Sequence, residues 1–94
     1  MRRSLLLTLL LLSSAAGAHG NMVQQAQGAT DSCLKFMLDN EPKKLVHLFK
    51  SVHTEVTGNE QFSVQITLRD GTVLNYKNHS VPNGDDAVTW VCAR

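Results

Sequence analysis

The sequence predicts an α+β fold, in which two short N-terminal helices pack on a three-stranded antiparallel β-meander and one disulfide joins the two parts. Three observations predict this fold. Apolar residues recur at helical spacing before residue 54, apolar and polar residues alternate after residue 60, and one cysteine lies in each part. Residues 30–94 are expected to form this single small domain.

Residues 1–18 are expected to form a secretory signal peptide outside the fold. The stretch opens with two arginines, continues with an apolar run over residues 5–12 that only Thr8 interrupts, and ends in the small-residue cleavage signal Ala16-Gly17-Ala18. The run is shorter than the about 20 apolar residues that span a membrane. We therefore expect an exported protein, periplasmic or secreted, with no stable membrane insertion after cleavage.

Cleavage after Ala18 removes 18 of the 94 residues and leaves 76, with seven Lys and Arg against eight Asp and Glu. The two arginines of the signal account for the slight basicity of the full chain. A near-neutral domain without a basic cluster argues against nucleic acid as a partner.

Residues 19–29 are rich in Gly, Gln and Asn, with little apolar pattern, and are expected to form a flexible N-terminal lead. The first helix is expected to begin at Thr30 or Asp31, both good N-cap residues, and to break before Pro42. Its apolar stripe is formed by Cys33, Phe36 and Met37 and is widened by Leu34 and Leu38.

A second helix is expected over residues 42–53. Its apolar residues follow the spacing i, i+3, i+4 and i+7, at Leu45, Leu48, Phe49 and Val52. The opposite face carries Lys43, His47 and Lys50, which together are a candidate surface for a partner. Such a face also occurs as the solvated side of an amphipathic helix.

An antiparallel hairpin is expected over residues 61–78, because apolar and polar residues alternate on both sides of Asp70-Gly71. A two-residue turn would place polar side chains opposite the apolar row. A three-residue loop from Arg69 to Gly71, with Gly71 in the left-handed conformation, avoids this mismatch. We therefore expect the register that pairs Ile66 with Leu74 and Val64 with Tyr76.

After a loop over residues 78–86, a third strand is expected over residues 87–92, with Val88, Trp90 and Cys92 facing inward. Cys33 and Cys92 are the only cysteines after the signal, and both lie on predicted core faces. Oxidising compartments favour pairing, and a small domain gains stability from a cross-link. We therefore expect a structural disulfide between them.

Cleavage after Ala18 would make His19 the mature N-terminus, where an α-amine and an imidazole on one residue suit copper. No two of the remaining histidines have metal-ligand spacing, so His19 is the candidate metal ligand. The pair Asp85-Asp86 lacks the ligand spacing of a calcium loop. The triplet Asn78-His79-Ser80 matches the N-glycosylation pattern.

No nucleophile motif, phosphate loop or His-Glu-x-x-His motif occurs in the sequence. We therefore expect a small exported protein, without catalytic activity or a cofactor, that binds or inhibits a macromolecular partner in the cell envelope or outside the cell. A protein is the expected partner. A copper-binding protein that uses His19 is the alternative hypothesis, and a small hydrolase is the third.

Overall fold

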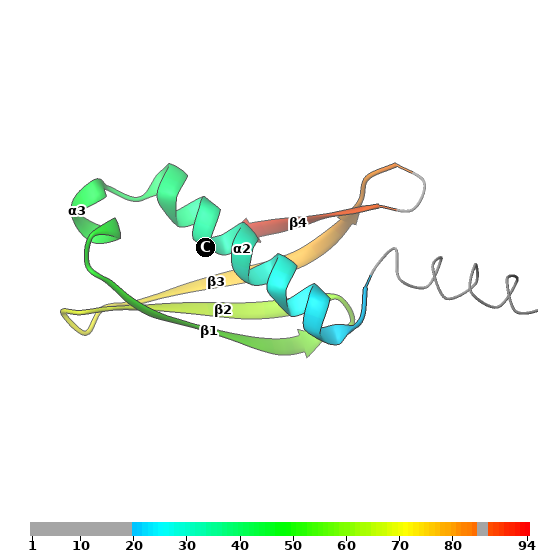
Figure 1. The fold of residues 1–94 in the computed structure, drawn as a ribbon, viewed down its shortest axis with the longest axis horizontal. Helices are drawn as coiled ribbons and strands as arrows, with labels where there is room; N and C mark the ends of the chain where they lie inside the picture. Colours follow the sequence, from blue (N-terminus) through cyan, green and yellow to red (C-terminus); the bar gives the residue numbers. More distant parts are fainter. Residues whose placement is uncertain (1–19, 85–86) are drawn as a thin grey trace, which may run out of the picture.

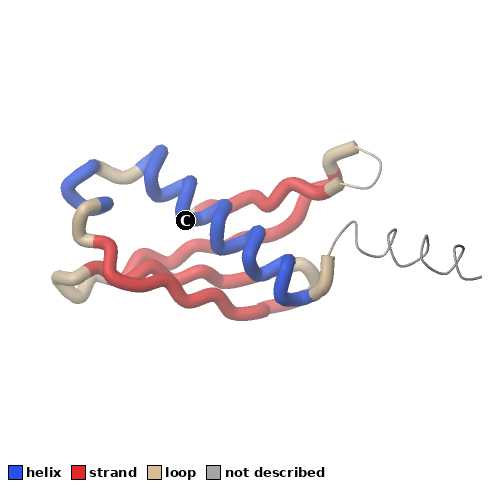
Figure 2. The backbone as a smooth tube through the Cα atoms, viewed as in Figure 1, coloured by secondary structure: helices blue, strands red, loops and turns tan. Residues whose placement is uncertain are grey.

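The computed structural model describes residues 20–84 and 87–94, which form a helix layer on a four-stranded antiparallel sheet (Figures 1 and 2). The strands follow one another as a meander in the order β1-β2-β3-β4. Their bounds are β1 Phe49–Gly58, β2 Gln61–Leu68, β3 Val73–Pro82 and β4 Val88–Ala93. The α+β class is confirmed, but the sheet has four strands instead of three.

One long helix, α2 (Met22–Asn40), lies on one face of the sheet (Figure 1). It begins eight residues before the expected start, so the flexible lead and the N-cap at Thr30 or Asp31 are wrong for this stretch. The reason is a capping box, in which the Gln24 backbone N–H donates to the Asn21 side chain and the Asn21 N–H donates to the Gln24 side chain. The helix ends at Asn40, as expected, because Glu41 precedes a proline and is extended.

The second expected helix, over residues 42–53, is wrong. Only one turn, α3 (Lys43–Val46), is helical, and strand β1 begins at Phe49. Residues 52–57 hold four β-branched side chains, which favour a strand over a helix. Strand β1 is the fourth strand, which the sequence analysis did not predict.

The hairpin register is confirmed. In the β2–β3 pair Val64 lies opposite Tyr76 and Ile66 lies opposite Leu74. The Gly71 backbone N–H donates to the Leu68 carbonyl, and Gly71 has a φ of 92°, the left-handed conformation that glycine adopts without strain. At the same turn the Thr72 backbone N–H donates to the Asp70 carboxylate and lowers the pKa of that carboxyl.

The core lies between α2 and the inward face of the sheet. Buried apolar residues come from α2, β2, β3 and β4, and they are Ala29, Cys33, Met37, Phe62, Val64, Ile66, Leu68, Leu74, Tyr76 and Cys92. Trp90 on β4 packs edge-on against Phe62 and against the backbone of Gly28, where a Cβ would lie only 2.6 Å from the indole. Small residues in α2 therefore let the helix approach the sheet closely.

The Cys33–Cys92 disulfide joins the middle of α2 to β4, with the two Cα atoms 5.2 Å apart. Strand β4 directs Cys92 inward, as expected, while β3 continues to Pro82 through part of the expected 78–86 loop. Within the described residues, no helix has the length and apolar character needed to cross a bilayer. The predicted signal peptide, His19 and Asp85-Asp86 lie outside the described residues.

Candidate partner-binding site

An exposed apolar patch lies where α2, α3 and the start of β1 meet. We call it the apolar patch; its residues are Leu34, Leu38, Val46 and Phe49, beside the buried Met37. They line a shallow hollow of about 240 Å³. Leu38 is 64% exposed and Phe49 is 39% exposed, which is unusual for large apolar side chains that lie side by side on a small domain.

A β-bulge places Phe49 in the patch. Phe49 pairs with Leu68 and Ser51 pairs with Thr67, so Lys50 is an extra residue without a cross-strand partner. Residues three apart on a regular strand face opposite sides of a sheet, but the bulge restores Phe49 to the side that carries Val52 and the helix. Without the bulge, Phe49 would lie on the helix-free face.

The connection between α3 and β1 is held by Arg69 at the end of the β2–β3 hairpin. The Arg69 guanidinium donates to the His47 carbonyl, and the Arg69 backbone N–H donates to the Leu48 carbonyl at 2.7 Å. These hydrogen bonds satisfy carbonyl groups that the end of a short helix leaves free. The patch is therefore built on a fixed connection between two layers.

The candidate residues Lys43, His47 and Lys50 do not share one helix face, as the sequence suggested. Lys43 lies in α3, His47 is the residue that ends α3, and Lys50 is the bulged residue of β1. All three are exposed, and they flank Val46 and Phe49 along the chain. Among residues 20–84 and 87–94, neither lysine forms an ion pair, so their charges are available to a partner.

The sequence analysis did not find the patch because it assigned Leu34, Leu38 and Phe49 to core-facing helix stripes. A helix turns by about 100° per residue, so Leu38 lies about 140° from the buried Cys33. That angle is too wide for one core-facing stripe. The sequence therefore already indicated that Leu38 would be exposed. The exposure of Phe49 had no such signal, because it depends on the bulge.

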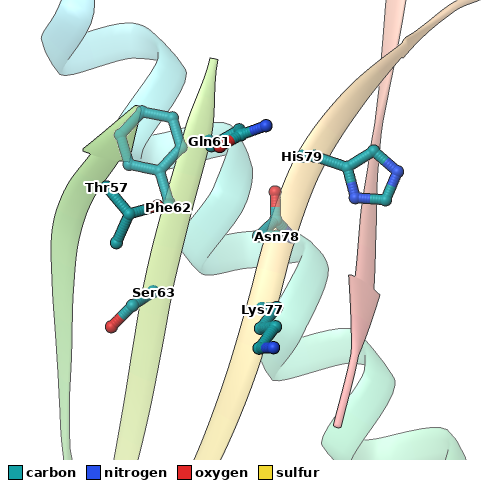
Figure 3. Close-up of a pocket in the computed structure, with 7 residues that line it drawn as sticks. All are labelled: Thr57, Gln61, Phe62, Ser63, Lys77, Asn78 and His79. Atoms are coloured by element: carbon teal, nitrogen blue, oxygen red, sulfur yellow. The ribbon is translucent and has the colours of Figure 1, made fainter. Parts of the chain in front are cut away.

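A second hollow of about 360 Å³ lies beside β1, β2 and β3 (Figure 3). Its polar lining comes from Thr57, Gln61, Ser63, Lys77 and His79, and the side chains of Phe62 and Asn78, also at its border, are buried toward the helix. The lining offers hydroxyl, amide, imidazole and ammonium groups but no carboxylate. Nor do any lining side chains form the hydrogen-bonded nucleophile–base pair that a hydrolase needs.

The candidate metal ligand His19 lies outside the described residues, and the N-glycosylation motif falls on the buried Asn78. Within this part of the chain, no three His, Cys, Asp or Glu side chains are grouped as metal ligands would be. Asn78 is buried, and its side-chain N–H groups face the Ala29 carbonyl and Cys33 Sγ, both at 3.4 Å. The folded domain therefore has no room for a glycan on Asn78.

An ionic cluster closes the end of the domain near the C-terminal residue. Arg94 Nη1 lies 2.8 Å from Glu41 Oε2, and the guanidinium lies 5.8 Å from the centre of the Tyr76 ring. Burial of Tyr76, followed by the nearby charge of Glu41, raises the pKa of its hydroxyl. The cluster ties the end of α2 to the end of β4, and we assign it a structural role.

No family model, no curated protein and no solved structure matches this chain.

Proposed function

We propose that this protein is an exported, non-catalytic binding protein that engages or inhibits a protein partner through the apolar patch. The observation that carries the proposal is the exposure of Leu38 and Phe49 beside Val46, on a surface fixed by Arg69. Exposed apolar clusters with a polar rim are typical of protein–protein contacts.

The charges beside the patch indicate the chemistry of the partner. Lys43, Lys44 and Lys50 lie next to the apolar residues, and none of the three is neutralised by an acidic side chain within the described residues. A complementary partner segment carries apolar side chains flanked by Asp or Glu. Burial of the apolar side chains would supply affinity, and the lysines would raise the association rate and orient the segment.

The first experiment replaces a residue of the patch and a matched residue elsewhere. Leu38→Asp places a carboxylate in the patch, and Val91→Asp places one at an exposed apolar position on β4 that lies outside it. Each variant is immobilised and exposed to the exported protein fraction, and captured proteins are quantified against the unchanged protein. We expect one or more proteins to be retained by the unchanged protein and Val91→Asp but lost with Leu38→Asp.

The second experiment tests the charges with the captured partner. Lys43→Glu combined with Lys50→Glu should slow association, and added salt should slow association of the unchanged protein in the same way. Equal retention by Leu38→Asp and the unchanged protein would contradict the patch as the docking surface. Release of a product from the captured partner would contradict the non-catalytic assignment.

A further inference from the structure

The outer edge of β1 is the feature that the proposed function does not use. Strand β1 has ten residues and pairs only with β2 among the described strands. Its ladder is regular from Ser51 to Val56, between bulges at Lys50 and Thr57. An edge of this kind presents unpaired backbone groups to another strand, and the two bulges limit the regular part of the edge to the six residues from Ser51 to Val56.

The sequence of this edge is complementary to itself. Around Thr54 the order is Val52, His53, Thr54, Glu55 and Val56. In an antiparallel pair centred on Thr54, each Val52 lies opposite Val56 of the other copy and each His53 lies opposite Glu55 of the other copy. Directly opposite residues share a face, so both apolar pairs lie on the helix side and both polar pairs lie on the open side.

The exposures agree with this pairing. Val56 is 50% exposed although it points to the helix side, and Val23 at the start of α2 is 67% exposed. His53 Nε2 and Glu55 Oε1 lie 2.9 Å apart within one chain, with both side chains more than 60% exposed. An imidazole and a carboxylate that already attract each other along one strand would do so across two strands as well.

Neighbouring registers of the two β1 strands place poorly matched side chains opposite each other. A pair centred on His53 would place the two His53 side chains opposite each other and Lys50 opposite Val56. A pair centred on Val52 would place Phe49 opposite Glu55. Only the Thr54 register matches apolar with apolar and acid with imidazole at every position from Val52 to Val56.

The other outer strand is less suited to pairing. Strand β4 has six residues, and the Trp90 carbonyl oxygen accepts a hydrogen bond from Ser32 Oγ at 2.7 Å. The helix therefore lies against β4 and satisfies part of its backbone. Among the described residues, the hydrogen bond between α2 and β1 joins the Thr30 and Thr54 hydroxyls, so it involves side chains and not the backbone of β1.

We propose that β1 pairs antiparallel with β1 of a second copy of this chain, centred on Thr54. The two sheets become one continuous sheet, and the helices of both copies lie on the same face. The paired residues, Val52 to Val56, do not belong to the apolar patch or to the lysines beside it, so failure of this proposal would leave the proposed function standing.

The test measures molar mass by sedimentation equilibrium, from low micromolar to several hundred micromolar protein. We expect a monomer–dimer equilibrium for the unchanged chain. His53→Glu or Glu55→His alone places like groups opposite each other at two positions, and each should weaken the dimer by about tenfold or more. The double variant His53→Glu/Glu55→His exchanges the two partners and should restore dimerisation to within about threefold.

Val56→Lys, on the helix side of β1, should also weaken the dimer, whereas Val91→Lys on β4 should not. Circular dichroism checks that each variant is folded, which is expected because the replaced side chains are exposed. A chain that stays monomeric at every concentration would overturn the proposal. Equal dimerisation by the single and double variants, or loss with Val91→Lys alone, would assign any dimer to another surface and overturn it too.

Discussion

Removing the Cys33–Cys92 disulfide should lower the free energy of unfolding by about 4 kcal/mol. The two cysteines are 59 positions apart in the sequence. In the chain-entropy model, a cross-link over such a loop restricts the unfolded chain by about 4 kcal/mol. Domains are stable by only about 5–15 kcal/mol, and small ones lie near the lower limit. A variant without the bond should therefore be close to unfolding at room temperature.

The variant is Cys33→Ala/Cys92→Ala, and the assay is urea unfolding followed by the fluorescence of Trp90, the only tryptophan. Trp90 packs on Gly28 and Phe62, so its emission reports the contact between α2 and β4. The free energy of unfolding should fall more steeply with urea concentration in this variant, because an unlinked chain exposes more surface when it unfolds.

Reductant provides the control for this prediction. It should lower the unfolding midpoint of the unchanged protein and leave the double variant as it was. A loss of less than about 1 kcal/mol would refute the reasoning from loop length. So would a reductant effect of equal size on both proteins, because the double variant has no bond to reduce.

Three further predictions concern single positions. Gly71→Ala should lower the free energy of unfolding, measured with urea, by on the order of 1 kcal/mol, because Ala must adopt a φ near 92°. An unchanged free energy of unfolding would contradict the left-handed turn. Gly28→Ala should lower the urea unfolding midpoint, because the new Cβ would lie 2.6 Å from the Trp90 ring. This clash should outweigh the better helix propensity of Ala. A higher midpoint would show that the Trp90 ring moves aside freely. Tyr76→Phe should change stability little at neutral pH, because the buried hydroxyl has no hydrogen-bond partner among the described residues. The pKa of Tyr76 is raised on folding, so its contribution to stability is complete below about pH 10 and is lost as the pH rises through the higher folded value. Tyr76→Phe should therefore reduce the alkaline loss of stability in unfolding curves, and an unchanged loss would contradict this.

The parts of the fold that could be predicted from the sequence are those that depend on local rules. The hairpin register follows from the alternation in β2 and β3 together with one glycine that can turn left-handed. The disulfide could be predicted from the cysteine count, from the expected export of the chain and from the inward face of Cys92. Neither depends on how the rest of the chain packs.

The early start of α2 had a local signal that composition obscured. Asn21 and Gln24 have the spacing of a capping box, but residues 22–28 hold few large apolar side chains. Ala29 is fully buried, and the Trp90 ring lies against Gly28. A helix that packs through small residues shows a weak hydrophobic period, so a search for large apolar residues finds its start too late.

The misassignment of β1 and the unforeseen exposure of Phe49 in the apolar patch have the same physical cause. Leu45 and Leu48 belong to one helical turn and its exit, while Phe49 and Val52 lie on the same side of a strand. Two residues three apart can share a side of a strand only if a bulge inserts an extra residue between them, and here that residue is Lys50. One turn of helix followed by a bulged strand thus reproduces the spacing of a longer helix. Because the bulge also turns Phe49 toward α3 and places Lys50 beside it, the irregularity that concealed the strand in the sequence produces the surface proposed to bind a partner.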